Sequence, residues 1–312
     1  AGVLIEAETG QVLFARNEHL RLPPASVTKV MTMLIIMEAV DSGRVKLDEQ
    51  VTTSPEAAGM GGSQIFLKEG ESLSFAKMIE AIAVVSANDA STAVAEHLYG
   101  STDEFIRRMN QRAAELKLNN THFINETGLP DPNHYTSVYD MAVLSRELVV
   151  AHPKIMQWTS IKNDSIRNGA FKLYNTNRLL WYYEGADGIK TGHTQEAGFC
   201  LAATVKRKEM RLISVIFGAS SDAERLQLTR NLMEYGFRNF TRHVPAQKGE
   251  EVTKTRIPNA VRPVSIRLSR DLVAVVKKEE VDRIRLETRL DQEKRAPLPK
   301  GALVGQTIAF VD

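Results

Sequence analysis

Strand-like segments lie at both ends of the first 240 residues, and helical patterns fill most of the stretch between them. Apolar and polar side chains alternate over residues 2–15 around a turn at residues 8–10, which is typical of a hairpin. Residues 186–218 carry further strand-like runs, whereas residues 76–150 mostly repeat their apolar side chains at helical spacing. Strands from both ends can share one sheet. The pattern therefore predicts an α+β layered domain, an antiparallel sheet flanked by helices with a helical insertion.

Caps and helix breakers bound the predicted elements. The first helix is expected to begin at Ser26, after the Pro23-Pro24 pair, and to end at residues 41–43. In a later helix we assign Asp140 and Glu147 to the polar side. Helices are expected over residues 76–86, 89–99, 103–117, 137–150 and 222–240, and an extra strand over residues 166–174.

The composition changes after residue 240. Residues 241–312 are rich in Val, Ile, Arg and Thr with period-two alternation and are interrupted by prolines, which predicts a small all-β domain. We therefore expect two domains, residues 1–240 and 241–312. The second carries a net charge of +5 and the first −3. This charge is equally compatible with contact to an anionic envelope surface and with an ordinary solvated sheet face.

Composition also argues against several classes of function. The net charge of the whole chain is +2, and no Lys/Arg block is interleaved with aromatic residues, so nucleic acid is not an expected partner. No apolar run is long enough to span a bilayer. The histidines are scattered without a ligand pattern, so neither a metal nor another cofactor is expected. The single cysteine, Cys200, lies in an apolar stretch and is interpreted as a buried small hydrophobe.

Three short motifs follow one another in a fixed order: Ser26-Val27-Thr28-Lys29, Ser86-Ala87-Asn88 and Lys190-Thr191-Gly192. Each alone is weak, because a helix-capping serine or a surface lysine is the more common explanation. Together they supply a nucleophile with a lysine one helical turn away, a second hydroxyl with an amide, and a cation beside a glycine. This set is typical of serine acyl-transfer enzymes.

The first motif predicts an activated serine. Ser26 needs a base, and Lys29 lies on the same helix face. A lysine acts as a base only if its pKa falls far below the usual value. Burial and a second cation, for which Lys190 is the obvious candidate, both lower it. A helix N-terminus at Ser26 would also stabilise developing negative charge.

The second motif offers two polar groups. The Ser86 hydroxyl can relay a proton to a leaving amine. The Asn88 amide can hold a substrate carbonyl or orient Lys29.

The third motif is interpreted as an edge strand along which an extended peptide lies. Gly192 is expected to leave room for that peptide. Lys190 and Thr191 can bind a carboxylate, and the backbone N–H groups of Ser26 and His193 can form an oxyanion hole.

With its flanking segments, the sequence resembles the low-molecular-mass penicillin-binding proteins, the D-alanyl-D-alanine carboxypeptidases of the penicillin-binding protein 5 type. The resemblance covers residues 1 to about 240 well and the rest more loosely. The segments that carry it are residues 22–32, 66–70, 121–123, 128–129, 175–177 and 185–194.

The resemblance implies a penicillin-binding/β-lactamase-like domain and acyl transfer on the peptidoglycan stem peptide that ends in D-Ala-D-Ala. Ser26 would release the terminal D-alanine and would also be acylated by β-lactam antibiotics such as penicillin. Arg225 would help bind the substrate carboxylate; the alternative is an ordinary surface arginine. Family members usually have a C-terminal membrane anchor. We expect an enzyme at the outer face of the bacterial cytoplasmic membrane, here as a fragment without its signal peptide and anchor.

Two alternatives remain at the level of sequence. A class A β-lactamase uses a glutamate in an E-x-x-L-N string, which residues 115–119 match literally; because Glu115 continues a predicted helix into a carboxypeptidase-like segment, we interpret the match as accidental. A catalytically silent wall-binding protein could retain the fold. The intact motifs, with Lys29 and Lys190 together, argue against it.

Overall fold

The computed structural model describes residues 1–311 and divides into two compact units, Ala1–Gly236 and a second that begins at Phe237. The first unit is built on a five-stranded antiparallel sheet in the order β2-β1-β9-β8-β7. Val3 of β1 pairs with Val215 of β9, so strands from both ends of this unit meet in one sheet, as predicted. The strands are β1 (Gly2–Glu6), β2 (Val12–Arg16), β7 (Ala186–Thr194), β8 (Gly198–Arg207) and β9 (Met210–Ala219).

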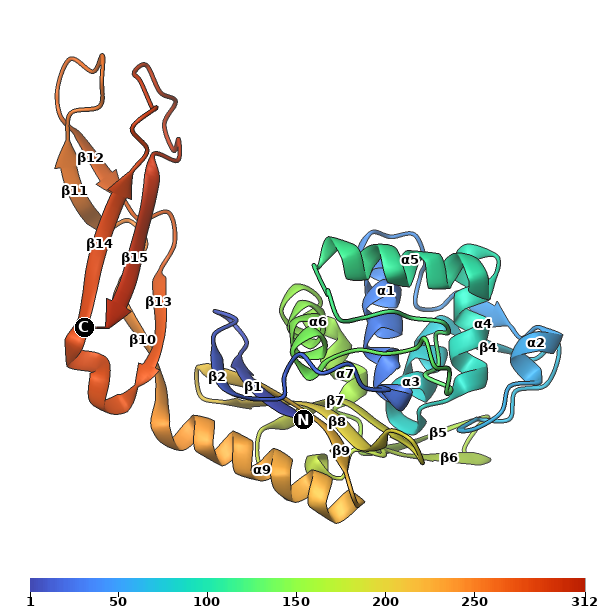
Figure 1. The fold of residues 1–312 in the computed structure, drawn as a ribbon. Helices are drawn as coiled ribbons and strands as arrows, with labels where there is room; N and C mark the ends of the chain where they lie inside the picture. The colour runs from blue at the N-terminus through green and yellow to red at the C-terminus, as the bar shows by residue number, and fades with distance from the viewer. Residues whose placement is uncertain (312) are drawn as a thin grey trace. The chain divides into compact units, whose positions relative to one another are not determined.

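Helices cover both faces of this sheet (Figure 1). On one face, α1 (Lys29–Asp41) is buried along nearly its whole length, since every side chain from Val30 to Met37 is inaccessible; it is the central helix of its layer. On the other face, α9 (Asp222–Asn239) packs closely, with Gly236 against side chains of Leu4 and Leu212.

Several of the helices around α1 begin at serine caps. The side chains of Ser74, Ser101 and Ser137 each accept a hydrogen bond from a main-chain N–H in the first turn of the helix that follows. The helices and 3₁₀ turns are η1 (Ala25–Thr28), α2 (Pro55–Ala58), α3 (Phe75–Val85), α4 (Asn88–Tyr99), α5 (Thr102–Glu115), α6 (Val138–Ala151), η2 (Pro153–Ile155), α7 (Met156–Thr159) and α8 (Leu179–Tyr182). Small hairpins pair β3 (Gln50–Thr52) with β4 (Ser72–Ser74), and β5 (Asn163–Ile166) with β6 (Phe171–Tyr174).

Two local predictions need correction. The strand prediction over residues 166–174 is right for the end of β5 and for β6, but residues 167–170 form the turn of the β5–β6 hairpin, with Arg167, Asn168 and Gly169 at positive φ. Asp140 is not on a polar face; it is buried, and its carboxylate accepts hydrogen bonds from the Asn120 N–H and the Thr121 hydroxyl. A buried carboxylate of this kind holds a loop, a role that helical periodicity does not reveal.

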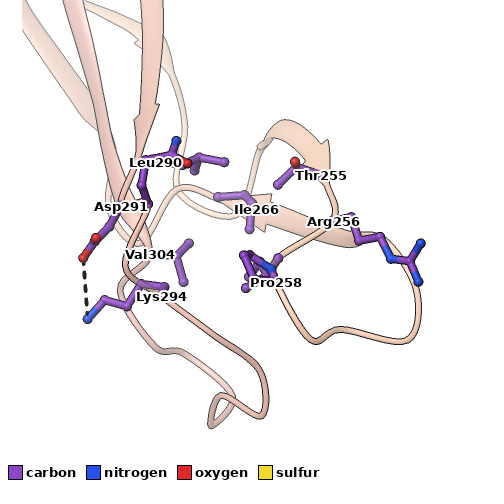
Figure 2. A pocket seen from close by; sticks show the side chains of 10 residues that line it. Thr255, Arg256, Pro258, Ile266, Leu290, Asp291, Lys294 and Val304 are labelled. Carbon is purple, nitrogen blue, oxygen red and sulfur yellow. Dashed lines mark ion pairs between the residues drawn. The ribbon is translucent and has the colours of Figure 1, made fainter.

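The second unit consists of three antiparallel strand pairs, β10–β13, β11–β12 and β14–β15. Its side chains leave a hollow of about 100 Å³ lined in part by Pro258, Ile266, Leu290 and Val304 (Figure 2). None of the helices within residues 1–311 combines the length and the apolar character that a membrane span requires. The elements are β10 (Phe240–Ala246), β11 (Glu251–Thr255), β12 (Val264–Arg267), β13 (Leu272–Lys277), η3 (Lys278–Arg283), β14 (Ile284–Leu290) and β15 (Gly305–Val311).

Candidate active site

Ser26 and Lys29 lie where η1 passes into α1. Ser26 is in the 3₁₀ turn and half-buried, and Lys29 is the first residue of α1. The ammonium of Lys29 reaches the hydroxyl of Ser26 at 3.2 Å. The predicted helix start is therefore a tight turn that places the hydroxyl one turn before the amine.

The amine of Lys29 is fully enclosed, with none of the residue exposed. Besides Ser26 Oγ, it donates to Asn88 Oδ1 and to the main-chain oxygen of Thr127, each at 2.7 Å. Burial lowers the pKa of Lys29 to about 7, although the negative charges of Glu126 and Asp89 act to raise it. Burial, rather than a second cation, is thus the main cause of the low pKa.

The second motif lies at the junction of two helices. Ser86 ends α3 with a left-handed backbone (φ 66°), and its buried hydroxyl oxygen has no hydrogen-bond partner within residues 1–311. Asn88 begins α4 rather than ending the preceding helix. Its amide is used at both ends, because Oδ1 accepts from Lys29 and Nδ2 donates to the Gly61 oxygen at 2.7 Å. In this arrangement Asn88 orients Lys29, one of its two predicted uses.

The third motif lies on β7, an edge strand of the sheet, as predicted. Lys190 is 1% exposed, and its ammonium donates to the main-chain oxygen of Thr191 at 3.0 Å. The Thr191 hydroxyl lies 2.5 Å from that of Thr176. Burial, helped by the nearby charges of Lys29 and Arg225, holds the pKa of Lys190 well below its usual value.

Gly192 lies against the backbone of η1, a contact that the sequence did not predict. A Cβ there would lie 2.9 Å from the Pro24 oxygen and 3.0 Å from the main-chain nitrogens of Ser26 and Val27. The missing side chain therefore lets β7 approach the η1 backbone. Gly128 (φ +85°) lets its own loop approach the η1 backbone in the same way, since a Cβ at Gly128 would lie 1.9 Å from the Ala25 oxygen.

His193 and Arg225 differ in exposure. His193 has an exposed side chain whose ring centroid lies 4.1 Å from that of Phe199. Arg225 is buried, so the surface alternative is wrong. Its guanidinium donates to the main-chain oxygens of Gly192 (3.3 Å) and Cys200 (3.1 Å) and pairs with Asp222. Arg225 thus ties β7 to β8 directly behind the third motif.

Sequence reasoning missed two contacts of the first motif. Thr127 contributes only its main-chain oxygen, which every residue type carries, so the sequence cannot indicate this contact. His134 is buried; its Nδ1 accepts from the Ile124 N–H at 3.1 Å, so its Nε2 carries the proton and donates to Thr28 Oγ1 at 2.7 Å. Burial lowers the pKa of His134 to about 4, which keeps the ring neutral. The sequence signals near these two residues were the flanking segments at residues 121–123 and 128–129.

Glu115, the glutamate of the β-lactamase-like string, ends α5 on the surface. Its carboxylate pairs with Arg108 at 2.8 Å and with Arg112 at 3.2 Å. In this position it stabilises the outer surface of α5, which agrees with the interpretation of the string as accidental.

The five-stranded sheet, the buried helix α1 and the three convergent motifs define a penicillin-binding/β-lactamase-like serine enzyme. Residues 1–221 match the family described as D-alanyl-D-alanine carboxypeptidase, and residues 240–312 match the penicillin-binding protein 5 C-terminal domain. The chain belongs to the D-alanyl-D-alanine carboxypeptidase family, serine peptidases of family S11.

Relatives and solved structures agree with this assignment. The chain is 41% identical to the D-alanyl-D-alanine carboxypeptidase DacF of Bacillus subtilis, over 100% of this chain and 81% of DacF. It is 36% identical to DacD of Escherichia coli, over 97% and 80%. The structure of penicillin-binding protein 5 from Haemophilus influenzae superposes with a TM-score of 0.91 at 31% identity, over 100% of this chain and 92% of that one. The expected fold and enzyme class are confirmed.

Proposed function

We propose that Ser26 is the nucleophile and Lys29 the general base of a serine-type D-Ala-D-Ala carboxypeptidase that trims the terminal D-alanine from peptidoglycan pentapeptide stems. The observation that carries this proposal is the 3.2 Å contact between Lys29 Nζ and Ser26 Oγ, which is within reach of proton transfer. Because the pKa of Lys29 is about 7, a large fraction of the amine is neutral near pH 7 and able to accept the hydroxyl proton.

In the first step Lys29 takes the proton of Ser26, and Ser26 Oγ bonds to the carbonyl carbon of the penultimate D-alanine. The backbone N–H groups of Ser26 and His193 stabilise the oxyanion. The carbon–nitrogen bond then breaks, and the proton held by Lys29 passes through the Ser86 hydroxyl to the leaving amine. The buried, unpartnered hydroxyl oxygen of Ser86 supports this relay.

In the second step water attacks the ester. The water oxygen bonds to the carbonyl carbon while Lys29 takes one water proton; the bond between that carbon and Ser26 Oγ then breaks, Lys29 returns the proton to Ser26 Oγ, and the shortened stem is released with a new terminal carboxyl group. No metal or cofactor is required for either step.

Lys190 and Thr191 bind the terminal carboxylate of the substrate. Lys190 donates one hydrogen bond within the described chain, which leaves donors for a ligand oxygen. Arg225 acts from behind the strand, since its guanidinium already binds the oxygens of Gly192 and Cys200. These contacts support a role for Arg225 in carboxylate binding that consists of holding β7 and adding positive charge.

Penicillin acylates the same serine, because a β-lactam presents a strained amide and a carboxylate in place of the two D-alanines. A relative, penicillin-binding protein D2 of Listeria monocytogenes, has been solved in its ampicillin-bound form; it is 31% identical over 76% of this chain and 96% of its own, with a TM-score of 0.70. We also infer that the enzyme works at the outer face of the cytoplasmic membrane, held by a C-terminal anchor, since its substrate lies there.

The test is D-alanine release from a pentapeptide stem by the wild type and by Ser26→Ala, with mass spectrometry after benzylpenicillin. We expect release and a single adduct on Ser26 in the wild type and neither in the variant. An unmodified, inactive wild type would mean a silent wall-binding protein. Rapid, repeated hydrolysis of a chromogenic β-lactam would mean a β-lactamase.

A further inference from the structure

Glu126 is a buried carboxylate beside the base, and the mechanism above does not use it. It lies in the loop between α5 and α6 and is 3% exposed. Within residues 1–311 its carboxylate accepts one hydrogen bond, at 2.5 Å from the hydroxyl of Thr92 in α4. Its main-chain oxygen accepts from the hydroxyl of Thr32 in α1 at 2.7 Å. Residue 126 is therefore fastened to both helices that hold the base.

These contacts close a ring around Lys29. Lys29 and Thr32 lie one turn apart on α1, and they bind the main-chain oxygens of Thr127 and Glu126. Asn88 and Thr92 lie one turn apart on α4; Asn88 binds the ammonium of Lys29, and Thr92 binds the carboxylate of Glu126. The side chain of Glu126 is thus linked through α1 and α4 to the groups that hold the Lys29 amine.

The other buried carboxylate near the base, Asp89, accepts hydrogen bonds from more donors than Glu126 does. Its two oxygens accept hydrogen bonds from the main-chain N–H groups of Ile65, Leu67 and Ala90, which spread its negative charge and fix the preceding loop. Glu126 has a single hydroxyl donor instead. Consistent with this, the Glu126 charge opposes the fall in the pKa of Lys29 more strongly than Asp89 does.

The remaining ionisable groups around this ring come from several elements. Lys190 lies on β7, and burial together with the charges of Lys29 and Arg225 holds its pKa well below the usual value, whereas His134 of the following loop is neutral. Glu96 on α4 faces Glu126 one turn beyond Thr92, and burial raises its pKa. Charges farther along the packed helices are paired or bound among themselves: Glu38 with Arg108 and Arg112, Lys77 with Glu80, and Asp140 with Asn120 and Thr121.

We propose that Glu126 is a positioning residue for Lys29. The buried negative charge of the Glu126 carboxylate sets the pH at which Lys29 begins to act as the base. The inference rests on the proposed function and adds to it the group that tunes the base. Removing the charge makes the ammonium form of Lys29 less stable, so the neutral base is present at lower pH, and the base becomes weaker.

The test is the pH profile of acylation of Ser26 by a fluorescent penicillin, measured between pH 5 and 9 for the wild type and Glu126→Gln. The acid limb of this profile is the rise in rate on its acid side. We expect the pH at the midpoint of the acid limb to fall by about one unit. Acylation at pH 6 then rises about five-fold relative to each protein's plateau, whereas the plateau above pH 8 falls because the base is weaker. A purely structural role would lower the rate at every pH without moving the limb.

Three variants complete the test. Glu126→Asp retains the charge and should keep the acid limb near that of the wild type. Glu184→Gln removes an exposed glutamate and controls for net charge. If Glu126→Gln does not fold, Glu126→Met makes the same change without an amide to satisfy.

The outcomes separate the two proposals. A wild type that penicillin fails to acylate contradicts the proposed function. A normal wild-type profile with an unmoved limb in the uncharged variants overturns the role of Glu126 alone.

Discussion

The active site has two walls, and each presents a buried lysine. On the helical wall, formed by α1, α4 and the loop at residues 125–128, Lys29 donates to three acceptors that fix its direction toward Ser26. On the strand wall, β7 carries Lys190, whose ammonium donates to one main-chain oxygen within the described chain.

This difference separates two tasks that the same side chain can perform. A base must be held in one direction and must lose its proton near neutral pH, which the enclosed, fully bonded Lys29 achieves. A carboxylate-binding group needs donors to spare, which Lys190 retains. The acceptors around an ammonium, rather than its burial alone, distinguish the two roles.

The largest expected effect is on the helical wall. Lys29→Met should lower the rate constant for acylation about 10³- to 10⁴-fold at every pH, because the hydroxyl of Ser26 loses its base. Stopped-flow acylation by a fluorescent penicillin measures it, with the exposed Lys68→Met as control. Loss of less than tenfold would mean that the base lies on the strand wall.

Gly128→Ala tests the close backbone contact of the helical wall. The new Cβ would lie 1.9 Å from the Ala25 oxygen at φ +85°, so we expect a loss of about 3 kcal/mol in unfolding free energy. Gly43→Ala, at φ +74° with nothing within 4 Å, isolates the backbone cost and should lose about 1 kcal/mol. Equal losses in chemical denaturation would contradict the tight contact.

His134 makes the helical wall sensitive to acid. Its folded pKa is about 4, below the ordinary value of 6.5, so the unfolded chain binds a proton that the folded chain does not. Its stabilising contribution is complete above pH 6.5 and is lost as the pH falls toward 4, by about 3 kcal/mol at most. Denaturant unfolding between pH 7 and 4 measures this loss. His134→Gln should flatten that part of the curve, and an unchanged slope would contradict the assignment.

On the strand wall, Lys190→Met should raise the KM for a pentapeptide stem and lower kcat/KM about 100-fold, the value of a charge-assisted hydrogen bond. The reason is the lost partner for the substrate carboxylate. Steady-state D-alanine release measures it. A stem amidated at its C-terminus is the control, since it should already be a poor substrate and lose little more. A drop confined to kcat would indicate that Lys190 belongs to the proton path.

The fold and the three motifs were readable from the sequence because they depend on periodicity and on side-chain type. Such local signals predict the sheet that joins strands from both ends of the first unit. They also predict the buried helix after Pro24 and the edge strand with Lys190. The contact of Thr127 with Lys29 was not predicted, because only the main-chain oxygen of Thr127 takes part in it. Glu126 and Asp140 escaped because the burial of a carboxylate depends on what packs over it. The contact of Gly192 with the η1 backbone was not predicted, because a close approach between segments far apart in the sequence depends on the tertiary structure.

The smallest effect is expected at Glu115, which contrasts with the buried Glu126. Glu115→Gln should cost about 0.5 kcal/mol or less, because its partners Arg108 and Arg112 are also paired with Glu38 and exposed ion pairs contribute little. It should leave deacylation of the penicilloyl-enzyme unchanged, as measured by the recovery of D-alanine release after penicillin is removed. A glutamate that activated the hydrolytic water would slow that recovery strongly when mutated. Such a result would place deacylation at the outer end of α5, away from both walls.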